Sequence, residues 1–125
     1  MTAQDKELTM AEKVFIATTG TGLSRASAST TAEFTTETVL DGTEVSSLAV
    51  DPLERNRIYA GTTGMGVLCS DDRGKSWRSA GLAGESVMAI AASPVKNGVV
   101  YAGVRPAALF VSIDGCASWH EVSAF

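Results

Sequence analysis

The chain has 125 residues, 45% of them hydrophobic, so it is long enough and apolar enough to bury a core of ordinary domain size. The 10 Lys and Arg residues stand against 14 Asp and Glu, a net charge of -4, and no basic run would follow a phosphate backbone, which argues against a nucleic-acid partner. The single histidine excludes a His-based metal cluster, and no apolar run approaches the roughly 18 to 20 residues that span a bilayer, which argues against a membrane partner.

Residues 1–13 are interpreted as an N-terminal extension that precedes the regular part of the chain. Charged residues such as Lys6 and Glu7 are mixed there with scattered apolar ones. The segment therefore lacks the apolar core of a secretory signal. A cytoplasmic location is the default expectation.

The rest of the chain is dominated by an internal repeat. Val45–Pro52 matches Val87–Pro94 without a gap, and Ser70–Trp77 matches Ser112–Trp119. The offset is constant, because 87 - 45 and 119 - 77 both equal 42. A fixed period of this length is the signature of a repeat architecture.

A third, partial copy begins near the N-terminus. Phe15–Gly22 aligns with Tyr59–Gly66 at an offset of 44. This copy starts at the second strand of the unit described below, so its innermost strand is missing. We expect residues 14–44 to form the partial unit, residues 45–86 a full unit and residues 87–125 a second full unit.

Each unit consists of short apolar runs, rich in Val, Ile and Tyr and separated by Gly, Pro, Asn and Asp, which is typical of strands and turns. No window carries a helical apolar stripe. Four strands in roughly 40 to 45 residues is the period of a β-propeller blade. The predicted strands are 45–50, 57–62, 66–70 and 76–79 in one unit, and 86–92, 99–104, 108–112 and 118–122 in the next.

The sequence therefore predicts an all-β fold: a partial β-propeller of four-stranded antiparallel blades, about two and three-quarter blades in all. The tyrosines Tyr59 and Tyr101 occupy equivalent second-strand positions, and we expect both to be buried against neighbouring blades. The two tryptophans, Trp77 and Trp119, are expected in equivalent buried positions.

A short motif recurs after the third strand of each full unit. Ser70-x-Asp72-x-Gly74-x-Ser76-Trp77 resembles the Asp-box (BNR) motif of sialidases, sortilin-type receptors, xyloglucanases and photosystem assembly propellers. In the second copy Cys116 replaces the glycine, which leaves its turn geometry open. The structural residues assigned to the two boxes are Ser70, Asp72, Gly74, Ser76, Trp77, Ser112, Asp114, Ser118 and Trp119.

The resemblance implies that the box joins the third and fourth strands at the blade periphery, away from the central cleft where ligands bind. Its aspartate can accept hydrogen bonds from its own hairpin, its glycine permits a positive φ, and its tryptophan packs under the turn. We interpret Asp72 and Asp114 as fold-stabilising residues, with no catalytic or metal-binding role.

No residue is assigned to catalysis, to a cofactor or to a metal. The sialidase type needs an arginine cluster and a Tyr–Glu pair, and glycosidases in general need two carboxylates at one cleft. The sequence shows neither, and the simplest role of its loop carboxylates is solvation. Cys69 and Cys116 are expected to be free thiols. The loop carboxylates are Asp41, Glu44, Glu54 and Glu85.

The predicted function is a binding or assembly scaffold that is not catalytic as it stands, with a protein or a carbohydrate as its ligand. The alternative is a fragment of a BNR-repeat glycoside hydrolase whose catalytic residues lie outside these residues. The remaining blades are expected from a longer chain or from other copies, and the chain is not expected to be a closed monomer. Loops at strand ends are the candidate ligand positions: Thr62, Thr63, Gly64, Arg105 and Pro106.

Overall fold

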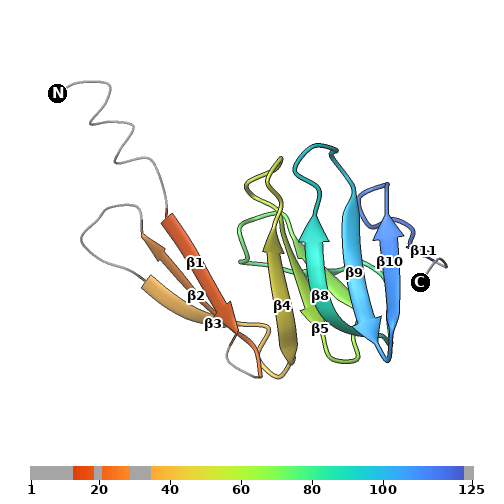
Figure 1. Ribbon diagram of the computed structural model, residues 1–125. Coiled ribbons are helices and arrows are strands. Elements are labelled where there is room, and N and C mark those ends of the chain that lie inside the picture. The colour runs from red at the N-terminus through yellow and green to blue at the C-terminus, as the bar shows by residue number, and fades with distance from the viewer. Residues whose placement is uncertain (1–12, 19–20, 29–34, 123–125) are drawn as a thin grey trace.

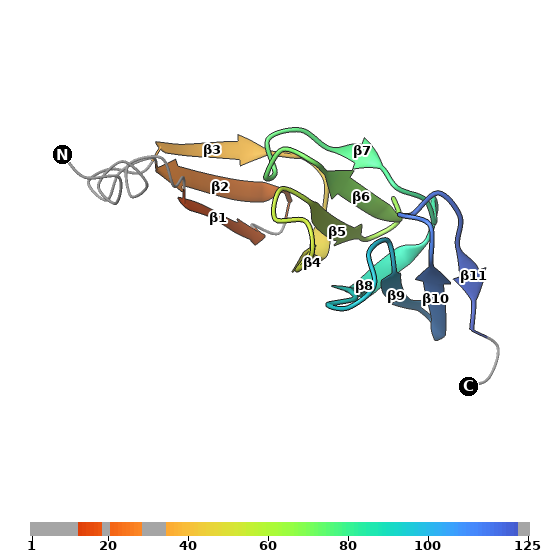
Figure 2. The ribbon, with the colours of Figure 1, turned by 90° about the horizontal axis from the view of Figure 1, so that it is seen from above.

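The computed structural model describes residues 13–18, 21–28 and 35–122. They form three antiparallel sheets that lie side by side (Figures 1 and 2). The fold is all-β, a partial β-propeller whose sheets are its blades. Within the described residues, no helix is long and apolar enough to cross a membrane.

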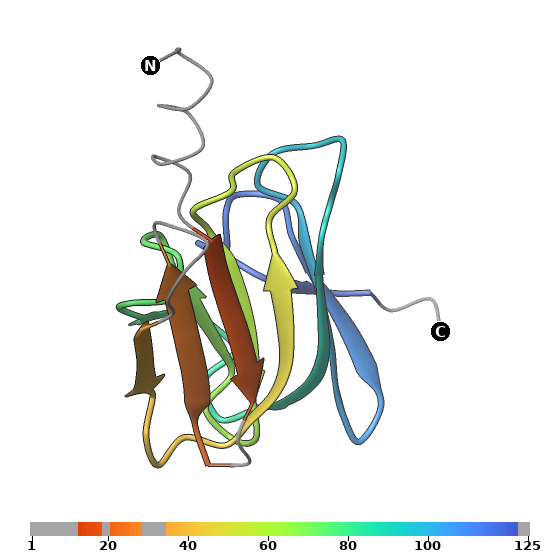
Figure 3. The same cartoon turned by 90° about the vertical axis from the view of Figure 1, so that its left-hand side faces the viewer.

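The first sheet has three strands in the order β1-β2-β3. They are β1 (Lys13–Thr18), β2 (Leu23–Ala28) and β3 (Thr35–Val39). By the repeat offset, β1 corresponds to the second strand of a complete blade. Figure 3 views the molecule from the side of this sheet, with β1 at the front.

The middle and last sheets have four strands each, in the orders β4-β5-β6-β7 and β11-β10-β9-β8. The innermost strands occupy the predicted residues in full, and the outermost ones are shorter than predicted because the Asp-box loops take up their first residues. The middle strands are β4 (Val45–Val50), β5 (Ile58–Thr62), β6 (Val67–Ser70) and β7 (Arg78–Ser79), and the last are β8 (Ser86–Ala92), β9 (Val100–Arg105), β10 (Ala108–Ser112) and β11 (His120–Glu121).

The innermost strands carry equivalent β-bulges, between Val45 and Ser47 in β4 and between Val87 and Ala89 in β8. A bulge bends its strand and increases the local twist. At Gly61 of β5 the two blades pack closely: an added Cβ atom would lie 2.7 Å from the Val87 Cγ1 atom of the next blade. The structural repeat therefore includes the β-bulges of the innermost strands as well as the strands themselves.

Two hydrophobic clusters join the three sheets. One lies between the middle and last sheets and contains Tyr59, Cys69, Val87 and Cys116. The other lies between the first and middle sheets, where Leu23 of β2 packs with Val45, Ala60 and Leu68 of β4, β5 and β6. The interior is thus formed between blades, as expected for radially packed sheets.

The expectation that both repeat tyrosines are buried is wrong for one of them. Tyr59 is 1% exposed because the last sheet covers it, whereas Tyr101 is 43% exposed. Among the described residues no further sheet follows the last one to cover Tyr101. The two tryptophans hold equivalent places in their loops, but both are half-buried where we expected full burial.

Candidate ligand site between the first two sheets

The first Asp box forms a closed set of local hydrogen bonds after β6. Asp72 accepts from the Ser70 hydroxyl at 2.7 Å and from the Ser76 backbone N–H at 2.9 Å, and the Gly74 N–H donates to Ser70 Oγ at 2.8 Å. The pKa of Asp72 is lowered to about 2, first by the hydrogen bond from the Ser76 hydroxyl. Bonds to the charged form favour ionisation, so the carboxylate is committed to its own hairpin.

The second Asp box keeps this geometry although a cysteine replaces the glycine. The Cys116 N–H donates to Ser112 Oγ at 2.8 Å, and Asp114 accepts from the Ser118 N–H at 2.9 Å. Cys116 adopts a φ of 74°, in the left-handed region where Gly74 has a φ of 90°. The turn of the second box therefore keeps the geometry of the first, although Cys116 must adopt a φ that is less favourable for a residue with a Cβ atom.

The tryptophans of the boxes differ in one contact. Trp77 Nε1 donates to the Gly74 carbonyl of its own box at 2.9 Å. Trp119 Nε1 donates instead to the Ala80 carbonyl of the preceding blade at 2.8 Å. The second box thus ties two blades together through a direct backbone contact.

Asp71, the neighbour of the box aspartate, belongs to an exposed ionic cluster. Arg57 Nε donates to it at 2.8 Å and Arg78 Nη2 at 3.2 Å. The hydrogen bond from Arg57 is the main cause that lowers the pKa of Asp71. Because these side chains are partly or largely exposed, the cluster contributes little to stability, and its arginines keep Asp71 in the ionised form.

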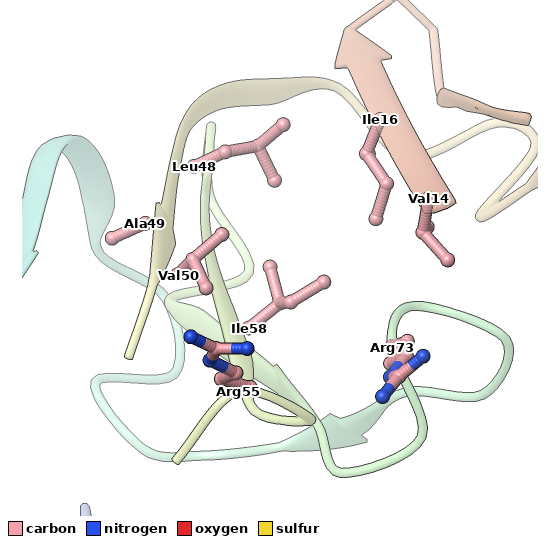
Figure 4. Close-up of a pocket in the computed structure, with 8 residues that line it drawn as sticks. All are labelled: Val14, Ile16, Leu48, Ala49, Val50, Arg55, Ile58 and Arg73. Atoms are coloured by element: carbon pink, nitrogen blue, oxygen red, sulfur yellow. The ribbon is translucent and has the colours of Figure 1, made fainter. Parts of the chain in front are cut away.

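A cavity of about 330 Å³ lies between the first and middle sheets (Figure 4). Its walls come from β1, from β4 and the start of β5, and from two loops. Six of the eight lining side chains are apolar, and none of the described residues that line the cavity carries a carboxylate. The lining residues are Val14, Ile16, Leu48, Ala49, Val50, Arg55, Ile58 and Arg73.

Two arginines give this cavity its polarity. Arg55 is exposed in the loop that follows β4, and Arg73 lies within the Asp-box loop. Arg73 Nε donates to the Asn56 side-chain oxygen at 2.7 Å, and its carbonyl accepts from Arg25 Nε at 2.9 Å. The cavity therefore offers apolar walls with positive charge at one end, which suits an apolar segment that carries a negative group.

None of the sequence-predicted ligand-loop residues lines this cavity. Thr62 is fully buried, and its hydroxyl donates to the Gly66 carbonyl at 2.8 Å, which closes the turn between β5 and β6. Thr63, Gly64, Arg105 and Pro106 are exposed at the other end of the blades. Ligand binding by these loops stays a prediction.

The cavity escaped sequence reasoning because its walls come from distant parts of the chain. Val14 and Val50 lie 36 positions apart, and each has the apolar character of an ordinary strand residue. One signal was present in the repeat itself: with the 42-residue offset, Arg55 and Arg73 correspond to Asn97 and Gly115. Of the two full units, only residues 45–86 carry a positive charge at these two positions.

The remaining candidate chemistry is inert. Cys69 and Cys116 are buried free thiols, and burial, followed by the neighbouring Cys69, raises the pKa of Cys116 to about 12. A protonated, buried thiol is a poor nucleophile. In the part of the chain that the structure describes, no group of three or more His, Cys, Asp or Glu side chains is placed to hold a metal ion.

Comparison with solved structures identifies the fold of the chain. It matches the GH74 xyloglucanase from Xanthomonas campestris with a TM-score of 0.65 and 19% identity, over 91% of this chain and 22% of that one. It matches YCF48 bound to D1 peptide with a TM-score of 0.63 and 15% identity, over 91% of this chain and 37% of that one. An ancestral GH74 enzyme matches with a TM-score of 0.66 and 16% identity, over 90% of this chain and 18% of that one.

These matches establish an Asp-box type of β-propeller fold, and the chain spans well under half the length of each of these proteins. No protein-family model and no curated protein sequence matches the chain. At these identities the likeness concerns the fold, and function has to be argued from the site.

Proposed function

We propose that this propeller segment is a binding and assembly scaffold and is not itself a catalyst. The observation that carries the proposal is the cavity between the first two sheets, with its apolar walls and two arginines. Ligand sites are typically concave and mostly apolar, with a few polar groups that fix orientation. Glycoside hydrolysis requires a pair of carboxylates at one cleft, and the described residues place no carboxylate in this cavity.

The aspartates of the Asp boxes support this proposal. Asp72 and Asp114 are engaged in their own hairpins and hold low pKa values of about 2, so neither is a general acid near neutral pH. A solved structure of the same fold holds a D1 peptide on YCF48, so a peptide is a ligand that such a propeller can carry. We therefore take a protein segment as the ligand of this chain.

The cavity can be tested with a matched pair of variants. Val50 lines it and is 60% exposed, whereas Val95 is 82% exposed and does not line it. A random peptide library displayed on phage is panned on the wild-type chain, on Val50→Glu and on Val95→Glu. We expect the wild type and Val95→Glu to enrich the same peptides and Val50→Glu to lose them at least tenfold, because a carboxylate would be placed against apolar walls. Equal enrichment by all three proteins would contradict the proposal.

The second candidate function is a segment of a glycoside hydrolase. Its support is the match to two GH74 enzymes over 90% or more of the chain. In that case the catalytic carboxylates lie outside the 125 residues, so the purified chain should not hydrolyse xyloglucan, other β-glucans or sialosides. Turnover that is abolished by a single substitution at a loop carboxylate of this chain would overturn the scaffold proposal. The residues to substitute are Asp41, Glu44, Glu54 and Glu85.

A further inference from the structure

One backbone edge of the first sheet lacks a partner strand. Within the described residues β1 pairs with β2 and with no other strand, whereas β5 is covered by β4 and β9 by β8. The unpaired N–H and C=O groups along such an edge are a template for an incoming strand. The cavity of Figure 4 lies beside this edge, since Val14 and Ile16 of β1 line it.

The cavity lies where the first sheet would have its innermost strand, by comparison with the two four-stranded sheets. In the complete pair of blades, β8 packs against β4 and β5, and an innermost strand stands beside the innermost strand of the preceding blade. A strand added to β1 would stand beside β4 in the same way. Leu48 and Val50 of β4 point into this space together with Ile58 (Figure 4). The repeat therefore defines the shape of the occupant, an extended strand antiparallel to β1.

The charges near the cavity define one end of this strand. A strand antiparallel to β1 runs in the direction of β4, so its C-terminal end meets the loops that carry Arg55 and Arg73. The residue that follows β4 in the repeat is Asp51. Opposite charges at this place favour an acidic residue at the C-terminal end of the incoming strand.

We propose that the free edge of β1 and this cavity form an acceptor site for an extended peptide strand of a partner protein. The strand adds to the sheet by backbone pairing, places apolar side chains against Leu48 and Ile16, and ends in an acidic residue beside Arg55. This is sheet augmentation, in which the main chain supplies affinity and the pockets supply specificity. The inference rests on the proposed binding function and adds the class of partner and the way it binds.

The test uses a fluorescently labelled peptide with the sequence of residues 44–53 of this chain, measured by anisotropy. Neighbouring amides of a strand point to opposite edges, and only one edge of the bound strand would face β1. Two peptides are therefore N-methylated, one at the position of Leu48 and the other at that of Ala49. We expect one of them to bind at least tenfold more weakly and the other to bind as the unmodified peptide does.

The charge at the end of the strand has its own control. A peptide with Asp51→Asn should bind about fivefold more weakly to the wild-type chain, and this difference should vanish in the Arg55→Gln variant. Hydrogen exchange of the full chain gives the location: the peptide should slow the exchange of alternate amides in β1 and leave β9 unchanged.

Several outcomes would overturn the inference. Equal weakening by both N-methylated peptides excludes pairing along one edge. Slow exchange, before any peptide is added, of the β1 amides that do not pair with β2 shows that the edge is already occupied. Protection of β1 that grows with protein concentration assigns the edge to a second copy of the chain. If library peptides bind through Val50 but these tests fail, the binding function stands and strand addition falls; if library peptides fail as well, both fall.

Discussion

Asp72 stabilises its own hairpin, because its carboxylate accepts hydrogen bonds from residues that are close to it in the chain. Its carboxylate accepts from Ser70 and Ser76, all within four positions of it. Since these donors favour the ionised form, the pKa of Asp72 falls to about 2 from an ordinary value of 3.8. Asp114 repeats this arrangement in the second box with Ser112 and Ser118.

This depressed pKa predicts the direction of one pH effect. A group whose pKa is lower in the folded than in the unfolded chain stabilises the fold above its unfolded pKa, and this contribution is lost as the pH falls through the folded value. We expect the urea midpoint of the wild type to fall between about pH 4 and about pH 2.5, and to fall less in Asp72→Asn, which lacks the titrating group. Identical pH dependence in the two proteins would contradict this account of the box.

At the residue scale the sequence was informative where interactions are local. The serines and aspartates of the boxes could be assigned because the hydrogen bonds that hold them join residues close together in the motif. The environment of Trp119 could not be assigned, since its Nε1 partner is the Ala80 carbonyl, 39 positions away. Its equivalent, Trp77, remains within its own box, and the motif alone does not distinguish these two outcomes.

At the scale of elements, the Asp-box loop of the middle sheet is also a contact with the first sheet. Arg25 of β2 is 1% exposed and donates from Nε to the Arg73 carbonyl at 2.9 Å. A Cβ atom added at Gly74 would clash with Ile16 Cδ1 of β1. The box therefore stabilises its own hairpin and, through its tip, the packing of two blades.

Two glycine substitutions separate strain within the chain from this contact between sheets. Gly74 and Gly64 both have a positive φ, but an added Cβ at Gly64 has no atom within 4 Å. We expect Gly64→Ala to cost about 1 kcal/mol from backbone strain alone. Gly74→Ala should cost about 1 kcal/mol more, because the terminal methyl of Ile16 must move. Urea unfolding of both variants measures the difference, and equal losses of stability would show that the contact does not contribute.

The strands were predictable to the extent that turn residues delimit them. The 42-residue offset and the alternation of apolar residues gave the inner strands β4 and β8 without error, since the turn segments next to them are unambiguous. The outer strands β7 and β11 have two residues each, because loop geometry, which strand propensity does not encode, decides where pairing begins. The cavity could not be predicted, because it depends on the placement of β1 against β4.

At the scale of the whole molecule, the last sheet presents a face that no other described sheet covers. The registers place Ala91, Tyr101 and Val111 on one side of it. Two of the equivalent residues of the middle sheet, Tyr59 and Cys69, are covered by the next blade. The same contrast holds for glycine: a Cβ at Gly61 would meet the next blade, whereas at Gly103 the nearest atom is Ala89 Cβ of its own sheet, at 3.8 Å. The face that is covered in the middle sheet is therefore open in the last sheet, as far as the described residues go.

Such a face should make the isolated chain associate, because apolar patches of this kind mark sites of protein contact or aggregation. Tyr101 is 43% exposed on the face, and Ile113 is 67% exposed in the Asp-box loop that follows β10, outside the three residues of the face. We expect light scattering of the wild type to rise with concentration, Tyr101→Lys to reduce this association, and Ile113→Lys, which adds the same charge away from the face, to leave it largely unchanged. A wild-type chain that is a monodisperse monomer and melts cooperatively above about 60 °C would show that the open face needs no cover, because that temperature lies in the upper part of the range of ordinary closed domains.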